Sequence, residues 1–171
     1  MIKNQNLLRP LASLTIFKLG NHSNQEVDRL RLNVRYISRQ CLSWIQEYGD
    51  AQDFADVVNV QYGKVICISL STAGGIGEEE DEEIRNVLDN IYNFLREQHE
   101  GRNNYWQPSF QPLPLLARIT EEQMEEEGAV EEMEALMSNV GQVKGLFGSI
   151  KHYAKVTKTV ILNHFIHGRR T

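Results

Sequence analysis

The residues with the clearest capacity for chemistry are acids and bases, and the chain keeps them apart. The 171 residues carry a net charge of −5, yet acids crowd positions 78–83 and 121–134, whereas 135–171 hold six Lys or Arg and no acid. Carboxylates at this density can bind a divalent cation, a basic protein surface, or only water and salt. A calcium loop of the EF-hand type needs alternating oxygen ligands around a central glycine, and that spacing is absent. We therefore predict no metal site.

The second acidic cluster is the harder one to explain within the chain. Carboxylates at 78–83 can open a helix and complement its positive end. Those at 121–134 continue beyond a first turn, where like charges four residues apart cost about 0.2–0.5 kcal/mol per pair. No Lys or Arg lies between Arg118 and Lys144 to relieve them. We predict either a solvated face or a surface for a basic partner, with candidate contacts at Glu125, Glu126, Glu127, Glu131 and Glu132.

The C-terminal segment supplies the opposite charge. Its cations could meet acidic protein, an anionic membrane surface or nucleic-acid phosphates. An acidic chain with a pI near 5.6 is a weak candidate for nucleic acid. The plainer interpretation is an amphipathic helix that docks on its own domain with the cations outward. The candidate contacts are Lys144, Lys151, Lys155, Lys158, Arg169 and Arg170.

The remaining reactive groups indicate no enzyme. No serine lies in a nucleophile motif, and Cys41 and Cys67 fall in apolar patterns that would bury them as inert thiols. His164 and His167 are three residues apart, but a metal needs a third ligand. The glycines at 74–77 precede a run of acids that would repel phosphate, so a phosphate loop is disfavoured. We predict no catalytic residue, no cofactor and no small-molecule substrate.

Apolar spacing predicts the elements of the N-terminal part. Leu11–Leu19 is typical of a strand, and Ser23 or Asn24 can cap a helix that ends at Tyr48, before Gly49. Val57–Gln61 and Lys64–Ser71 are predicted as a hairpin that turns at Tyr62–Gly63. The predicted helix carries one continuous apolar stripe formed by Val27, Leu30, Val34, Ile37, Cys41, Trp44, Ile45 and Tyr48.

The second half is predicted to be mostly helical. A helix from Glu79 to Gln98 is followed by a connector rich in proline, in which Tyr105, Trp106 and Phe110 either pin the loop to the core or form an exposed recognition loop. Thr120 and Gln123 form a capping-box pattern that would open a third helix. Residues 151–167 favour a helix, with a strand as the alternative because of their β-branched run.

These elements predict an α+β fold. A small, mainly antiparallel sheet in the order β-α-β-β-α would be packed by amphipathic helices and followed by a helical C-terminal region. Within a single domain, we expect an α+β core at 1–98, the connector at 99–119 and the helical region at 120–171.

The function predicted from the charge pattern is non-enzymatic. We expect an intracellular interaction or assembly protein that self-associates by placing its acidic helix (121–134) against the basic surface (144–170) of another copy. A viral accessory or structural protein would suit these features. The alternative is peripheral binding to anionic membrane or nucleic acid through the basic segment. The lack of a signal peptide, of a membrane-spanning run and of a disulfide framework predicts a cytoplasmic or nuclear location.

Overall fold

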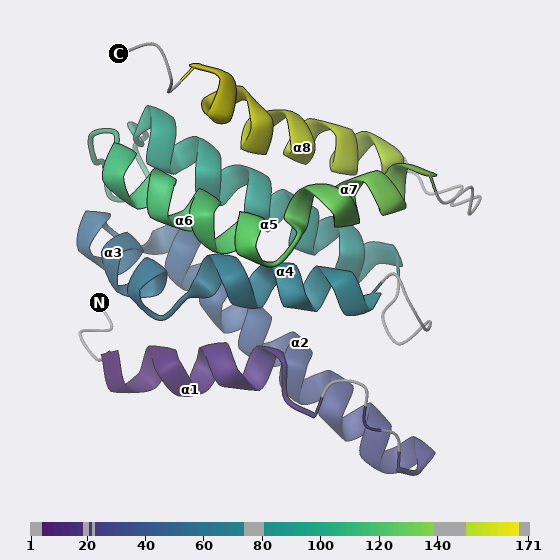
Figure 1. The fold of residues 1–171 in the computed structure, drawn as a ribbon. Coiled ribbons are helices and arrows are strands. Elements are labelled where there is room, and N and C mark those ends of the chain that lie inside the picture. The colour runs from purple at the N-terminus through teal and green to yellow at the C-terminus, as the bar shows by residue number, and fades with distance from the viewer. Residues whose placement is uncertain (1–4, 19–20, 22, 74–80, 139–149, 168–171) are drawn as a thin grey trace.

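The computed structural model describes residues 5–18, 21, 23–73, 81–138 and 150–167. This part of the chain folds into eight α-helices and contains no strand (Figure 1). The one β-type contact is an isolated antiparallel bridge between Arg102 and Phe110. The prediction of an α+β fold with an antiparallel sheet is therefore wrong. The helices are α1 (Gln5–Thr15), α2 (Gln25–Tyr48), α3 (Ala51–Asn59), α4 (Tyr62–Ala73), α5 (Asp81–Glu100), α6 (Pro114–Glu126), α7 (Ala129–Ser138) and α8 (Ile150–His167).

The bundle is organised around α4 and α5. Helix α4 packs against α1, α3, α5, α6 and α7, and α8 covers α5 and α7. In Figure 1, α1 lies at the bottom, α8 at the top, and α2 crosses behind α4 with its N-terminal end projecting at the lower right. The core is aromatic and aliphatic: the Phe94 ring lies 5.2 Å from the ring centroids of both Phe54 and Tyr62.

The first predicted strand, Leu11–Leu19, is wrong: Leu11–Thr15 continue a helix that starts at Gln5, residues 16–18 form a turn, and Leu19 lies outside the described residues. Leu8, Ala12 and Thr15 are buried at steps of four and three residues, which is helical and not strand spacing. The Thr15 hydroxyl also donates a hydrogen bond to the Ala12 carbonyl at 2.7 Å. Local β propensity is therefore outweighed by one buried helical face.

The predicted hairpin is replaced by α3 and α4. Asp50 accepts hydrogen bonds from the backbone of Gln52 and Asp53, while Asp53 accepts one from Asp50, so that a capping box opens α3. Helix α4 is buried on most sides, so its apolar residues show no clear period and resemble a buried strand. Gly63 is not a turn residue: a Cβ there would lie 3.1 Å from the Thr120 carbonyl, so glycine permits the approach of α6.

Other helix predictions are confirmed in part. Helix α2 starts after Asn24, whose side chain accepts a hydrogen bond from the Val27 amide, and the predicted helix at 79–98 is α5. Residues 150–167 are helical, so the strand alternative is wrong. The third predicted helix is also misplaced. It begins at Pro114, inside the predicted connector, and Gly128 (φ +70°) divides it into α6 and α7.

Within the described ranges, no helix combines the length and apolar character needed to cross a bilayer.

Candidate interaction surface

Helix α2 is the unusual element of this fold, because its polar side faces inward. Its buried residues are Arg35, Ser38, Arg39, Leu42 and Gln46, of which only Leu42 is apolar. On the opposite side, Leu30, Ile37, Trp44 and Tyr48 are between 55% and 59% exposed. Amphipathic helices of globular proteins normally bury the apolar side. The exposed apolar side of α2 is therefore the feature that a function must explain.

The exposed side has a regular spacing. Seven residues follow one another at alternating steps of three and four, which is the spacing of the a and d positions of a coiled coil. Three of them are half-buried and four are exposed. We call this set the α2 seam: Val27, Leu30, Val34, Ile37, Cys41, Trp44 and Tyr48.

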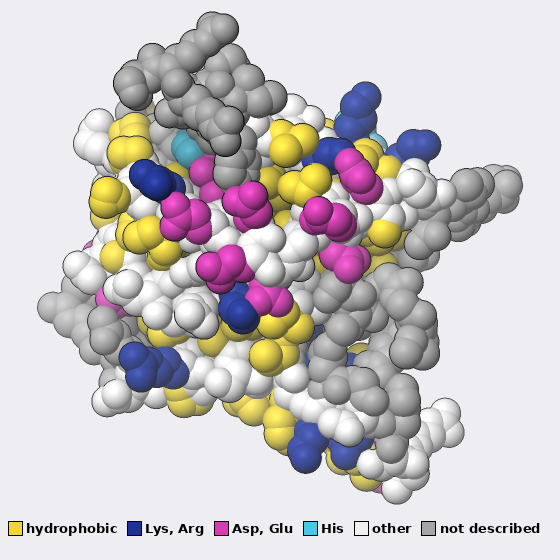
Figure 2. All heavy atoms as spheres, in the orientation of Figure 1, with side chains coloured by type: hydrophobic (Ala, Val, Ile, Leu, Met, Phe, Trp, Pro, Cys, Tyr) yellow, Lys and Arg dark blue, Asp and Glu magenta, His cyan; other side chains and the backbone are white. Residues whose placement is uncertain are grey.

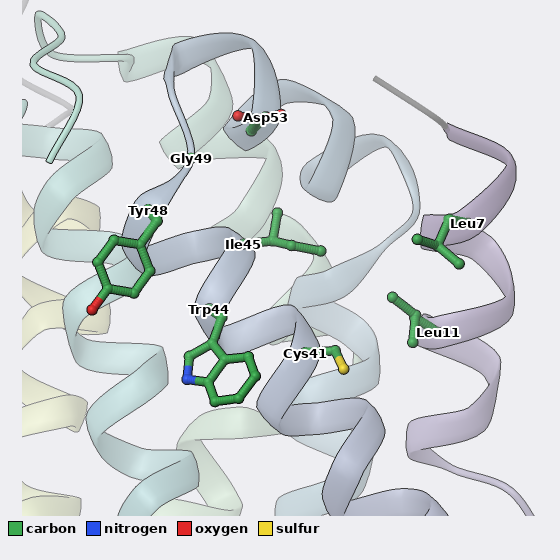
Figure 3. Close-up of a pocket in the computed structure, with 8 residues that line it drawn as sticks. All are labelled: Leu7, Leu11, Cys41, Trp44, Ile45, Tyr48, Gly49 and Asp53. Carbon is green, nitrogen blue, oxygen red and sulfur yellow. The ribbon is translucent and has the colours of Figure 1, made fainter. Parts of the chain in front are cut away.

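Helix α1 borders the C-terminal half of the α2 seam. Leu7 and Leu11 of α1 line an apolar groove of about 420 Å³ together with Cys41, Trp44 and Ile45 of α2 (Figure 3). In this view the Cys41 sulfur points toward Leu11, whereas Trp44 and Tyr48 point away from α1. The α2 seam is thus accessible along one edge and flanked by α1 along the other.

The inward polar side of α2 is held by specific partners. Arg39 donates to the Glu83 carboxylate at 3.1 Å, and Arg35 donates to the Phe17 carbonyl at 3.3 Å. The Gln46 amide donates to the Asn90 carbonyl at 3.2 Å. Buried polar groups without such partners would cost about 1–3 kcal/mol each. These contacts fix the rotation of α2 about its axis, and with it the exposure of the α2 seam.

Arg102 fixes the C-terminal end of α2 from the connector. Its guanidinium donates to the carbonyls of Gln46 (2.8 Å) and Gly49 (3.0 Å) and pairs with Glu97 at 2.6 Å. It also lies 5.4 Å from the Phe54 ring centroid and 4.9 Å from that of Phe110. Arg102 is only 5% exposed, so a single buried cation joins α2, α3, α5 and the connector.

The three connector aromatics differ in exposure: one packs against the core and two are exposed to solvent. Phe110 pins the loop, because its ring centroid lies 5.0 Å from that of Phe54. Tyr105 and Trp106 are 99% and 79% exposed. The connector also runs beside α2, since Gln107 lines a polar cavity together with Ser43.

The acidic residues at 121–134 gather on one face of α6 and α7 (Figure 2). Several receive a cation from a distant part of the same chain. Lys64 of α4 pairs with Glu127, and Lys158 of α8 pairs with Glu134. In the described part of the chain, four predicted contact residues form no ion pair and stay at least partly exposed: Glu125, Glu126, Glu131 and Glu132.

The predicted basic residues are only partly placed. Lys151 and Lys155 are exposed on α8, and Lys158 is bound to Glu134. Lys144, Arg169 and Arg170 lie outside the described residues, as do the side chains of His164 and His167. Because α7 and α8 pack against each other, acids and bases from the two predicted surfaces are neighbours within one molecule.

Other reactive groups form no catalytic arrangement among the residues that can be described. His99 and Glu121 make a part-buried pair at 2.8 Å. Cys67 is buried, which raises the pKa of its thiol to about 12, whereas Cys41 is half-buried beside α1. No group of three or more potential metal ligands is found in this part of the chain.

Comparison with protein-family models, with curated proteins and with solved structures gives no match for this chain.

Sequence reasoning found the residues of the α2 seam but placed them on the wrong side. Its regular spacing marks an apolar side, and the usual expectation turns that side toward the core. The residues between give no contrary signal, because Arg35, Arg39 and Gln46 are of types usually found at the surface, yet here they find partners inside. Those partners come from distant segments, so no local pattern could have revealed them.

Proposed function

We propose that this protein is a non-enzymatic interaction and assembly protein that binds a protein partner through the α2 seam. One observation carries the proposal: α2 buries its polar side and exposes large apolar residues at coiled-coil spacing. Apolar surface that is continuous and exposed typically marks an interaction site. The free thiols of Cys41 and Cys67 support a reducing compartment, and we infer that the protein acts in the cytoplasm or nucleus.

The α2 seam cannot be buried by a simple rotation of α2. Turning it inward would break the Arg39–Glu83 pair and the hydrogen bond from Gln46 to Asn90. It would also remove the Gln46 and Gly49 carbonyls from Arg102. A partner helix can cover the exposed side without disturbing any of these contacts, because they all lie on the opposite face.

The charged surfaces contribute less to this proposal than the sequence suggested. Lys64 and Lys158 already neutralise Glu127 and Glu134 within the molecule, which supports an intramolecular use of those charges. Contact between the acidic helix of one copy and the basic segment of another therefore has fewer free groups to use. Among the described residues, the exposed edge of the α2 seam has no such internal partner, and Leu30, Ile37, Trp44 and Tyr48 remain more than half exposed there.

Photo-crosslinking in expressing cells tests the proposed function. A benzophenone amino acid replaces Ile37 in the α2 seam, and the matched control carries it at the exposed Glu131 of the acidic face. We expect position 37, and not position 131, to give a discrete protein adduct that disappears when Trp44→Glu is added. The adduct is identified by mass spectrometry. If position 37 gives only the diffuse products seen at 131, the α2 seam has no protein partner and the proposal fails.

A further inference from the structure

We propose that the partner of the α2 seam is a second copy of this chain, whose own α2 lies antiparallel against it. The inference rests on the proposed function and names the partner for the same surface. Each copy would contribute one α2, flanked by its own α1, so that four helices meet around a two-fold axis. The axis would pass near the middle of the α2 seam, between Ile37 and Cys41.

The spacing of the α2 seam favours a helix that has the same spacing. Knobs-into-holes packing requires apolar residues at steps of three and four on both helices. The α2 seam keeps these steps from Val27 to Tyr48, through almost the whole of a 24-residue helix. A second α2 therefore presents a matching surface, which in an antiparallel pair centred between Ile37 and Cys41 extends from Leu30 to Tyr48, about 27 Å of helix length.

Electrostatic repulsion between two copies is weaker when they meet at α2 than when they meet at the acidic face. Helix α2 has four Arg against three acids, a net charge of +1, whereas the rest of the chain must carry −6 to give the total of −5. Two acidic α6–α7 faces would repel each other, while two α2 helices are nearly neutral. Two of the positions beside the α2 seam, Asn33 and Gln40, are uncharged.

Charge also selects the antiparallel direction. In an antiparallel pair, Arg29 of one copy lies within one helical turn of Glu47 of the other, and both residues are exposed. A parallel, in-register pair would instead separate Glu47 from Arg29 of the other copy by about 27 Å along the helices. Opposite charges that approach each other in only one direction of the pair favour that direction.

Side-chain size supports the same direction. The antiparallel register pairs Leu30 with Tyr48, Val34 with Trp44, and Ile37 with Cys41, each pair occurring twice. A parallel register would stack Trp44 on Trp44 and Cys41 on Cys41, so the helix separation would change along the interface. Close packing needs large residues opposite small ones.

The exposed area sets the expected affinity. If a large apolar side chain offers roughly 200 Å², the four side chains that are more than half exposed leave about 450 Å² per copy. Two copies with neighbouring polar atoms would then bury roughly 1,000 Å², which is near the lower limit for a specific interface. Interfaces of this size are typical of weak, transient complexes, so we expect a reversible dimer that dissociates on dilution.

Analytical ultracentrifugation of the full chain between about 1 and 500 µM provides the first test. We expect a monomer–dimer equilibrium that persists in high salt, because the interface is apolar. Ile37→Lys and Trp44→Glu should each weaken dimerisation more than tenfold. The matched control is Leu115→Lys on α6, which removes a large apolar residue that is 68% exposed outside the α2 seam. Circular dichroism checks that every variant keeps its helical content, and Ile37→Ser replaces Ile37→Lys if that variant unfolds.

Spin-label distances test the antiparallel order. In a Cys41→Ser background, labels are attached to Glu26→Cys or to Gln40→Cys, while the buried Cys67 stays unlabelled. The register places the two Gln40 labels near the two-fold axis and separates the two Glu26 positions by about 39 Å along the helices. A short distance at 40 with a long one at 26 supports the inference, whereas short distances at both positions show a parallel pair and overturn the order.

Failure of the inference can be separated from failure of the proposed function. A strictly monomeric chain at 500 µM, or a dimer that Leu115→Lys weakens as much as Ile37→Lys, overturns self-association through the α2 seam. If photo-crosslinking at position 37 then yields a different protein, the proposed function stands and only its partner changes. If dimerisation is lost in high salt, the charged surfaces and not the α2 seam hold the copies together, and the inference is wrong.

Discussion

Replacing Arg102 by methionine should destabilise the fold more than any surface substitution, because this one cation joins four segments. Its guanidinium holds the Gln46 and Gly49 carbonyls and the Glu97 carboxylate. The methionine side chain keeps the apolar packing between Phe54 and Phe110 but donates no hydrogen bond. Two carbonyls at the end of α2 and one carboxylate then lose their partner.

The magnitude follows from burial. The side chain of Arg102 is 2% exposed and that of Glu97 is 13% exposed. Removing one partner of such a buried pair costs about 3–5 kcal/mol, because the other charge stays uncompensated. We expect about 4 kcal/mol for Arg102→Met, a large share of the roughly 5–15 kcal/mol that stabilises a typical domain. Lysine keeps the charge but lacks the planar fork, so Arg102→Lys should cost about half as much.

Urea denaturation followed by far-ultraviolet circular dichroism measures these free energies. Arg118→Met is the matched control, because the Arg118–Glu122 pair is 80% and 55% exposed and should contribute below about 0.5 kcal/mol. Adding Glu97→Gln to Arg102→Met should recover part of the loss, since it removes the unpaired charge. A cost for Arg102→Met below about 1 kcal/mol, or equal to that of the control, would refute the role assigned to this cation.

Three further outcomes follow from the structure. Gly101→Ala should lower the free energy of unfolding by at least about 2 kcal/mol, because φ at this position is +75° and the new Cβ would lie 2.6 Å from a backbone oxygen. Urea denaturation measures this loss, and an unchanged midpoint would contradict it. Burial raises the pKa of Cys67 from 9.0 to about 12, so the thiol loses its proton at a lower pH in the unfolded chain than in the folded chain. The free energy of unfolding should therefore fall as pH rises above about 9. Urea midpoints from pH 8 to 10 should therefore decline less steeply in Cys67→Ala. If α8 binds anionic surfaces, Lys151→Glu with Lys155→Glu should abolish sedimentation with anionic vesicles at low salt, and equal retention of both proteins would exclude these two contacts.

The helices that sequence predicted correctly carry their own start signals. Asn24 caps α2 by accepting a hydrogen bond from Val27, and α5 follows a run of acids that suits a helix N-terminus. The failures at α1, α3 and α4 have a common cause. Their β-branched and apolar residues favour strands, but the whole scale of β propensities spans only about 1 kcal/mol. Burial in the tertiary structure readily outweighs a preference of this size. In α4 the burial on most sides also removes the period that distinguishes a helix from a buried strand.

The charge clusters show a different limit of local reasoning. Glu127 and Glu134 lack a nearby cation in sequence, which suggested an external partner. Their cations, Lys64 and Lys158, come from segments 63 and 24 residues away. Gly128 also interrupts the expected continuous helix, so Glu127 and Glu131 are not neighbours four residues apart on one helix. The excess of negative charge in this segment is therefore partly balanced by cations that are distant in the sequence but close in the fold.

The exposed α2 seam is energetically significant for the isolated chain. About 450 Å² of apolar side chain left in water corresponds to roughly 11 kcal/mol of burial not realised, as an upper estimate. Rotating α2 would recover that burial only by breaking the Arg39–Glu83 pair and the Arg102 contacts, at about 3–5 kcal/mol each. It would also strip Arg35 and Gln46 of their partners, at about 1–3 kcal/mol each, so the total cost is comparable with the gain. The fold therefore holds apolar surface outward because its polar contacts prevent the alternative. Association recovers the same burial at a cost of about 4–15 kcal/mol in lost motional freedom. This balance favours a reversible complex, and it explains why the polar side of α2 must remain where it is for the α2 seam to be available.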